Sequence, residues 1–243
     1  AASDVYKRQA YGFLATVIAV VFFPQSDPLT ALMAAYAIFA ISFILRPLGG
    51  IFWGHVGDKF GRKNALSWSI ILMTLATVCI ALLPSYQSIG IFAPILLLVF
   101  RMIQGFSASG EYAGAANFLA EYAPKKKRGL YTSLVPASTA AGLLLGSVMA
   151  AAMFAFMSEA FLHEYGWRIP FLLAAPLGLI GYYIRVKLED TPEFLEHQKT
   201  GQKENFPIKA LFNQYRPALF KAFAVASLNA TAFYLIFNYM PNY

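Results

Sequence analysis

The sequence predicts an all-α polytopic membrane protein. Of its 243 residues, 58% are hydrophobic and 13% are charged, whereas soluble domains average about 25% charged residues. The apolar residues gather in long segments, most of which reach the roughly 20 residues that a helix needs to cross a bilayer. The seven segments are residues 10–23, 29–53, 65–83, 91–120, 129–156, 168–187 and 218–240.

Basic residues alternate between the joins that connect these segments. The joins rich in Lys and Arg are 54–63, 121–128 and 185–221, and the joins that lack both are 24–28, 84–90 and 157–166. Because cytoplasmic loops of membrane proteins carry the excess of Lys and Arg, this alternation predicts that the basic joins face the cytoplasm. The net charge of +7, distributed in this way, argues against a nucleic-acid partner.

The first apolar segment is shorter than a crossing requires, and the residues before it look foreign. Asp4-Val-Tyr-Lys-Arg-Gln9 resembles the translation of a transposon adapter used in sequencing libraries. We therefore expect residues 1–9 to be a cloning or assembly scar, and the chain to be a fragment of a longer protein whose first helix is truncated.

The remaining chain is expected to fall into three parts. These are a transmembrane bundle over 10–187, a polar cytoplasmic linker over 188–217, and the first helix of a second bundle over 218–243. Tyr165 and Trp167, in the last outer turn of the first bundle, are expected in the aromatic belt where membrane meets water.

The join at 54–63 has the most informative pattern. It reads Gly54-His-Val-Gly57-Asp58-Lys59-Phe-Gly61-Arg62-Lys63. We predict a compact loop and a tight hairpin, because glycines let backbones approach and turn and because Asp58 lies within reach of basic neighbours. The pattern G-x-x-x-D-[RK]-x-G-R-[RK] resembles the signature loop of the major facilitator superfamily of secondary transporters. A merely basic loop would explain Lys59, Arg62 and Lys63 but neither Asp58 nor the glycine spacing.

Arg101 lies inside the apolar segment 91–120. A charge at such depth costs several kcal/mol, so the side chain is expected to face a cavity or a partner. Arg101-x-x-Gln104-Gly105 resembles a second superfamily motif, which in relatives is assigned to proton coupling or to organising the substrate cavity. The alternative is an arginine that pairs with carbonyls and locks helix packing. Ser107, on the same helix, is grouped with this site.

Glu111 follows Arg101 by ten residues, which is about 15 Å along a helix. Direct pairing of the two within the helix is therefore excluded. Two interpretations of Glu111 stay open: a protonatable site, or a gate residue bonded to the join 54–63.

A cytoplasmic gate is the expected role of a set of charged residues at the inner face, together with Gly54, Lys59, Gly61 and Lys63 of the join 54–63. The acidic and basic members are Asp58, Arg62, Glu121, Arg128 and Glu189. Similar positions recur in sugar-porter relatives. The alternative is a scatter of exposed ion pairs worth about 0–1 kcal/mol each.

Longer stretches resemble the metabolite:H+ symporter family. They are Gln104–Tyr112, Ala120–Gly129, Gly166–Phe171 and Leu188–Phe194, while Ser85–Gly90 and Ala93–Leu98 look most like the proline/glycine-betaine branch. The resemblance implies the major facilitator fold: an N-terminal six-helix bundle, a cytoplasmic linker and a seventh helix. It also implies proton-coupled symport of a small zwitterionic osmolyte, such as proline or glycine betaine, by alternating access across a bacterial inner membrane.

A zwitterion needs a cation for its carboxylate and aromatic faces for its ammonium group. Arg101 suits the first role, and Tyr11, Phe13 and Tyr234 suit the second. Polar residues of the seventh helix are expected either to complete the lining or to bridge helices; they are Asn229, Thr231 and Asn238.

Two other functions share these motifs. One is symport of an organic acid of the 2-oxoglutarate or shikimate type, and the other is a solute sensor with a transporter fold. No nucleophile–base arrangement suggests an enzyme. A lone Cys79 and scattered histidines predict no metal site and no cofactor. The expected partners are the solute, the proton and the lipid bilayer, with no obligate protein partner.

Overall fold

A computed structural model of the chain describes residues 14–24, 26–187 and 216–234. The chain divides into two compact units, Ala1–Gly201 and Gln202–Tyr243. The first unit contains helices α2 to α10, and the second contains α13 (Arg216–Tyr234). The expected scar and most of the expected linker lie outside the described residues.

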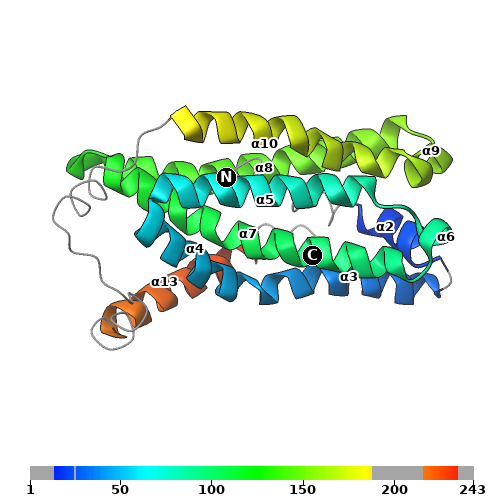
Figure 1. The fold of residues 1–243 in the computed structure, drawn as a ribbon, viewed down its shortest axis with the longest axis horizontal. Helices are drawn as coiled ribbons and strands as arrows, with labels where there is room; N and C mark the ends of the chain where they lie inside the picture. Colours follow the sequence, from blue (N-terminus) through cyan, green and yellow to red (C-terminus); the bar gives the residue numbers. More distant parts are fainter. Residues whose placement is uncertain (1–13, 25, 188–215, 235–243) are drawn as a thin grey trace. The chain divides into compact units, whose positions relative to one another are not determined.

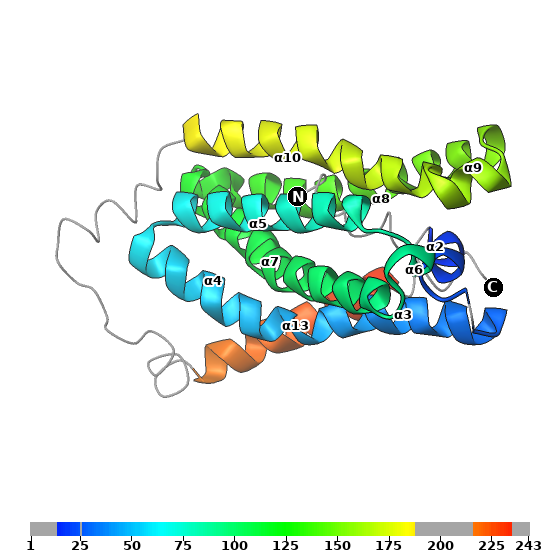
Figure 2. The same ribbon diagram turned by 45° about the vertical axis from the view of Figure 1, so that its right-hand side comes forward.

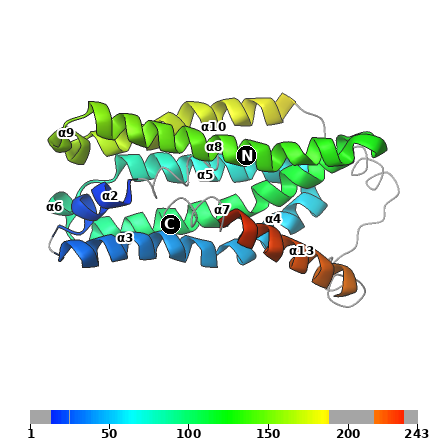
Figure 3. The same cartoon turned by 180° about the vertical axis from the view of Figure 1, so that it is seen from behind.

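Long helices make up the first unit. They are α3 (Pro28–Ile44), α4 (Arg46–Phe60), α5 (Arg62–Leu82), α7 (Phe92–Tyr122), α8 (Arg128–Phe156) and α10 (Ile169–Lys187). They run side by side, as Figures 1 and 3 show from opposite sides. Within the described residues, five stretches are long and apolar enough to cross a membrane, with α3 and α4 counted as one. The middle five predicted segments are therefore confirmed as helices, and α2 (Ala15–Phe22) and α13 are not among the five.

The turns between the long helices separate to the two ends of this unit (Figure 1). One end carries the α4–α5 turn and the three-lysine helix η1 (Lys125–Lys127); we call it the basic end. The opposite end carries α2, α6 (Tyr86–Ile89), α9 (Glu159–Glu164) and η2 (Gly166–Arg168). The first two basic joins thus share one end, as their alternation along the chain predicted.

The predicted loop at 54–63 is wrong in its extent. Helix α4 continues to Phe60, and the chain reverses at Gly61 alone, whose φ of 102° and ψ of 144° lie in a region that favours glycine. A Cβ placed on Gly57 would lie 3.7 Å from the Ala65 Cβ of α5, so this glycine stands at a helix contact rather than in a turn. Gly54 has no described neighbour within 4 Å of its Cβ position. The charged motif is therefore mostly a helix end.

The rod formed by α3 and α4 bends at Leu45, which lies between them. Pro47 stands in the first turn of α4, where its ring cannot donate a hydrogen bond and crowds the preceding turn. Figure 2 shows α4 leaving the line of α3. The bend separates the part of the rod at the opposite end from the part that carries the charged motif.

Helix α7 packs against α3, α4, α5 and α8. Its glycines allow the closest of these approaches: a Cβ on Gly105 would overlap the Ser42 carbonyl oxygen of α3, and one on Gly110 would lie 2.5 Å from the Trp53 Cβ of α4. The Trp53 indole also donates to the Phe106 carbonyl at 3.2 Å. These contacts fix α7 against the rod of α3 and α4.

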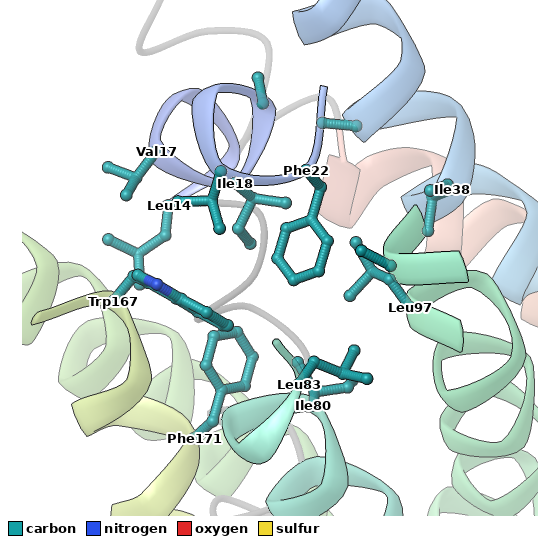
Figure 4. Packing of buried hydrophobic residues seen from close by; sticks show 14 of the residues in the cluster. Leu14, Val17, Ile18, Phe22, Ile38, Ile80, Leu83, Leu97, Trp167 and Phe171 are labelled. Carbon is teal, nitrogen blue, oxygen red and sulfur yellow. The ribbon is translucent and has the colours of Figure 1, made fainter. Parts of the chain in front are cut away.

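An apolar core occupies the opposite end (Figure 4). Trp167 is fully buried there, and its ring meets Phe22 and Phe171 edge-on at centroid distances of 5.5 and 6.2 Å. The prediction that Trp167 belongs to an interfacial belt is therefore wrong, whereas Tyr165 is exposed. The neighbouring Arg168 explains the burial.

Arg168 fastens η2 to the end of α5. Its guanidinium donates to the carbonyls of Ala81 and Leu83, both at 2.9 Å, and to that of Glu164 at 2.6 Å. These are carbonyls near a helix end, which lack partners within their own helix. The bonds hold the adjacent indole of Trp167 inward.

The tight contact at Gly105 predicts that Gly105→Ala destabilises the chain by about 1–3 kcal/mol, because a methyl group would push α7 away from the α3 backbone. The measurement is thermal unfolding of the purified chain in detergent. Gly50→Ala is the matched control, since Gly50 is helical and has nothing within 4 Å of its Cβ position. Equal unfolding temperatures for the two variants would contradict the packing described.

Candidate functional site

One face of α7 carries four buried polar residues. Arg101, Gln104, Ser107 and Glu111 are spaced by three, three and four residues, which aligns them along one side of a helix. Their exposed fractions are 1%, 1%, 0% and 3%. Helix geometry therefore brings together the four residues that the sequence assigned to proton coupling or substrate binding.

The Arg101 guanidinium begins a short hydrogen-bonded chain. Its Nη1 donates to Gln104 Oε1 at 2.7 Å, and the Gln104 amide donates to the Thr77 hydroxyl of α5 at 2.7 Å. The Thr77 hydroxyl donates to the Met73 carbonyl at 2.7 Å. Thr77 itself is fully buried. The R-x-x-Q spacing thus positions the arginine through a neutral amide, and α5 positions that amide.

The aromatic ring of Phe39 covers the same guanidinium. The Arg101 Cζ lies 5.0 Å from the ring centroid, a distance at which a cation is attracted to the ring face. Gln104 and Phe39 therefore hold the guanidinium in place, and its role in binding stays a prediction.

Ser107 lies one turn further along the same face. Its hydroxyl is fully buried and has no hydrogen-bond partner among the described residues. A buried hydroxyl without a partner costs about 1–3 kcal/mol, which a bound polar group or a water molecule would offset. Ser107 is therefore a candidate ligand contact between Gln104 and Glu111.

Glu111 is bonded to two neighbouring helices. Its Oε1 accepts from Arg185 Nη1 of α10 at 3.0 Å and from the Ser69 hydroxyl of α5 at 3.3 Å. Only 4% of the Glu111 side chain and 15% of the Arg185 side chain are exposed. Both of these partners lie outside the join 54–63, and the two interpretations of Glu111 stay predictions.

Sequence reasoning missed Arg185. The residue stands near the start of a basic join, and that clustering was explained by membrane topology alone. Its position in the last turn of an apolar segment was the available sign, because a charge at that depth needs a partner.

A second group of charges lies at the basic end. Arg62, the first residue of α5, contacts Asp58 at 3.3 Å and Glu121, near the end of α7, at 3.5 Å. These pairs connect α4, α5 and α7. Their side chains are 18–46% exposed, so each pair contributes about 0–1 kcal/mol.

The other predicted gate residues differ in position. Lys59 is exposed, with its Nζ 5.4 Å from the Phe60 ring centroid. Lys63 is half-buried in the first turn of α5, and Arg128 is exposed at the start of α8. Glu189 lies outside the described residues. Proximity is thus established for Asp58, Arg62 and Glu121, and the gating role of the whole set stays a prediction.

The predicted lining residues are described only in part. Asn229 and Thr231 lie in α13, and a spacing of two residues places them on nearly opposite sides of a helix. Tyr11, Phe13, Asn238 and the side chain of Tyr234 lie outside the described part of the structure. Their roles stay predictions. Where the structure describes the chain, no three His, Cys, Asp or Glu side chains gather to hold a metal ion.

A comparison with family models identifies the family of this chain. The model of the Major Facilitator Superfamily matches residues 9–243. The chain belongs to this superfamily. The relatives reported below are named as transporters, not as enzymes.

Curated relatives within the superfamily carry related names. The Proline/betaine transporter of Escherichia coli (strain K12) is 42% identical over 242 residues, which cover 96% of this chain and 48% of the relative. The Glycine betaine/proline/ectoine/pipecolic acid transporter of Dickeya dadantii is also 42% identical, with the same coverage. A Putative proline/betaine transporter of Staphylococcus haemolyticus is 41% identical and half covered. The chain spans about half the length of these relatives.

Solved structures show the fold. A D-xylose-proton symporter is similar at a TM-score of 0.69 and 20% identity, over 82% of this chain and 48% of that one. The inward open xylose transporter of E. coli is similar at 0.66 and 19% identity, over 98% and 55%. The chain has the fold of the N-terminal half of a major facilitator transporter.

Removing the Thr77 hydroxyl is expected to destabilise the chain, because the hydroxyl belongs to the hydrogen-bonded chain of Arg101, Gln104 and Thr77. Thr77→Val keeps the shape of the side chain but leaves the Gln104 amide without its acceptor, so we expect a destabilisation of about 1–3 kcal/mol in thermal unfolding of the chain in detergent. Thr132→Val is the control, because Thr132 is half-buried and its hydroxyl donates to the Arg128 and Gly129 carbonyls of its own helix. A loss no greater than that of the control would count against the network.

Proposed function

We propose that the protein to which this chain belongs moves a small zwitterionic osmolyte, such as proline or glycine betaine, together with protons across a bacterial cytoplasmic membrane. The observation that carries the substrate class is the 42% identity, over 96% of the chain, to proteins named proline/betaine transporters. Transport proceeds by alternating access between two bundles, of which this chain supplies the first.

The buried residues of α7 support each part of this proposal. A zwitterion presents a carboxylate, and Arg101 offers a positive charge that is held by a neutral amide. Ser107 offers a hydroxyl without a described partner on the same face. Glu111 is a carboxylate deep inside the bundle, which is the kind of group that binds and releases protons in transporters.

The charges at the basic end support a cytoplasmic gate. Arg62 joins the ends of three helices through its contacts with Asp58 and Glu121. Each contact is weak because it is partly exposed. Weak pairs suit a gate, since a transporter must populate both its closed and its open state at small cost.

Uptake by a hybrid transporter tests the substrate class. In the hybrid, this chain replaces the matching half of the E. coli relative, and the hybrid is placed in liposomes with an imposed inward proton gradient. We expect accumulation of labelled proline that unlabelled proline and glycine betaine suppress and that 2-oxoglutarate leaves unchanged. Suppression by 2-oxoglutarate alone would establish an organic-acid symporter. Saturable binding without accumulation would establish a sensor.

Arg101→Ala in the same hybrid is expected to lower gradient-driven uptake at least tenfold while membrane insertion is unchanged, since the buried cation would be lost. Lys126→Ala removes an exposed basic side chain and serves as the control. Near-normal accumulation in the Arg101 variant would remove this residue from the mechanism.

A labelling experiment tests the orientation of the chain in the membrane. Single cysteines at Lys59, Lys126 and Gln87, all exposed, are introduced into the chain after Cys79→Ser removes its one natural cysteine. A membrane-impermeant thiol reagent applied to intact cells is expected to label position 87 and to reach positions 59 and 126 only after the membrane is opened. Labelling of positions 59 and 126 from opposite sides would refute the topology.

A further inference from the structure

Two glycines of α10 face α5. A Cβ on Gly178 would overlap the Thr74 side chain, and one on Gly181 would lie 2.5 Å from the Ile70 Cδ1. The two glycines are one turn apart, and so are their partners on α5. Backbone and side chain thus meet at a distance that a residue larger than glycine would prevent.

Arg185 continues this contact face by one more turn toward the basic end. Its Nη1 donates to the Leu66 carbonyl of α5 at 2.6 Å, and Leu66 stands four residues before Ile70. Because the glycines hold the two helices close, the long side chain of Arg185 reaches across α5. It ends against Glu111 of α7, at 3.0 Å.

Among the contacts described above, the Arg185 guanidinium is the charged group that lies against Glu111. Ser69 contributes a neutral hydroxyl. Arg101 and Glu121 stand ten residues away on α7 itself, about 15 Å along the helix. Tyr112 stands beside Glu111 in α7. The other charged or titratable residues of the elements packed on α7 or α10 are Tyr36 in α3, Arg46, His55, Asp58 and Lys59 in α4, Arg62, Lys63 and Cys79 in α5, Tyr86 in α6, Arg128 and Tyr131 in α8, Arg168 in η2, and Tyr182, Tyr183 and Lys187 in α10.

The two partners differ in how easily each reaches water. Arg185 is a long side chain two residues before Lys187, the last described residue of α10, and such side chains reach the membrane surface readily. Glu111 is short, buried and eleven residues from the end of α7 at Tyr122. When the pair separates, the arginine can enter water and the carboxylate cannot.

We propose that Arg185 is a positioning residue for Glu111: it holds the carboxylate ionised while α10 rests on α5, and proton uptake by Glu111 releases the basic end of α10. The proton comes from the aqueous phase, adds to a carboxylate oxygen and leaves from the same atom. The charge-assisted bond to Arg185, which is stronger than a neutral one, is then lost and the guanidinium moves toward water. The place of this step in transport rests on the proposed function; the step itself does not.

Two readouts on the purified full chain in lipid nanodiscs test the proposal without transport. The first is the infrared band of a protonated carboxylic acid, followed against pH. The second is the distance between spin labels at Asn64→Cys of α5 and Val186→Cys of α10, both exposed positions, in the Cys79→Ser background. We expect the band to rise as pH falls, and a longer label distance to appear over the same pH range.

Variants of the pair separate a positioning role from simple packing. Glu111→Gln is expected to remove the band and to show the longer distance at every pH. Arg185→Met is expected to move the band to higher pH by about one unit or more, a tenfold change in proton affinity, and Arg185→Lys to restore most of the shift. Should Arg185→Met fail to fold, the double variant with Glu111→Gln removes both charges and tests the distance alone.

Glu159→Gln, an exposed acid of α9 at the opposite end, is the matched control and is expected to leave both readouts unchanged. The proposal is overturned if the band appears at the same pH in Arg185→Met as in the chain with Arg185. It is also overturned if the label distance does not change with pH when Arg185 and Glu111 are both present. Failure of the hybrid to take up proline, with both readouts as expected, would refute the proposed function and leave this inference intact.

Discussion

The polar side chains on one face of α7 need hydrogen-bond partners inside an apolar bundle. The rest of the structure depends on this constraint. A bilayer offers no hydrogen bonds, so each buried polar group on this face needs a partner from the protein, a ligand or an enclosed water molecule. Thr77 of α5 receives the Gln104 amide, and Ser69 and Arg185 meet Glu111. Helices α5 and α10 are therefore held in register by chemistry as well as by packing. Apolar contact alone could not fix their registers, because lipid and protein interiors are equally apolar.

The two ends of the bundle are held by different forces. At the end opposite the basic end, Trp167 and Phe22 lie in a closed apolar core, and Arg168 connects η2 to the end of α5. At the basic end, partly exposed ion pairs of Arg62 and the contact of Arg185 with Glu111 connect the helices. Apolar packing responds little to pH, whereas ion pairs depend on the charge of each partner. Under the proposed function, proton binding would therefore act mainly on the basic end.

Much of this arrangement follows from the sequence, and the exceptions have physical causes. Apolar length and basic joins predicted the long helices and their directions, and the three-residue spacing placed Arg101 beside Gln104. The helical extension to Phe60 was missed because Gly54 and Gly57 were interpreted as turn residues, although within a packed helix a glycine equally serves close approach. The burial of Trp167 depends on bonds of Arg168 to carbonyls 85 and 87 residues away. The pairing of Arg185 with Glu111 spans 74 residues and depends on glycines of α10 that no local pattern connects to α7.

The separation of the two buried charges along α7 has a consequence for coupling. Arg101 is bonded to the Gln104 amide and Glu111 to the Arg185 guanidinium, and the proposed function assigns the anionic group of the solute to the first and the proton to the second. About 15 Å of helix lies between them, too far for direct attraction to connect them strongly even at low dielectric. In a proton symporter the two sites must then communicate through movement of helices. Helix α7 is fixed against α3 and α4 at Gly105 and Gly110, which leaves α10 as the element whose seating responds to Glu111. Under the proposed function, solute binding at Arg101 would therefore be coupled to the proton through the position of α10 and the end of α5 that it covers.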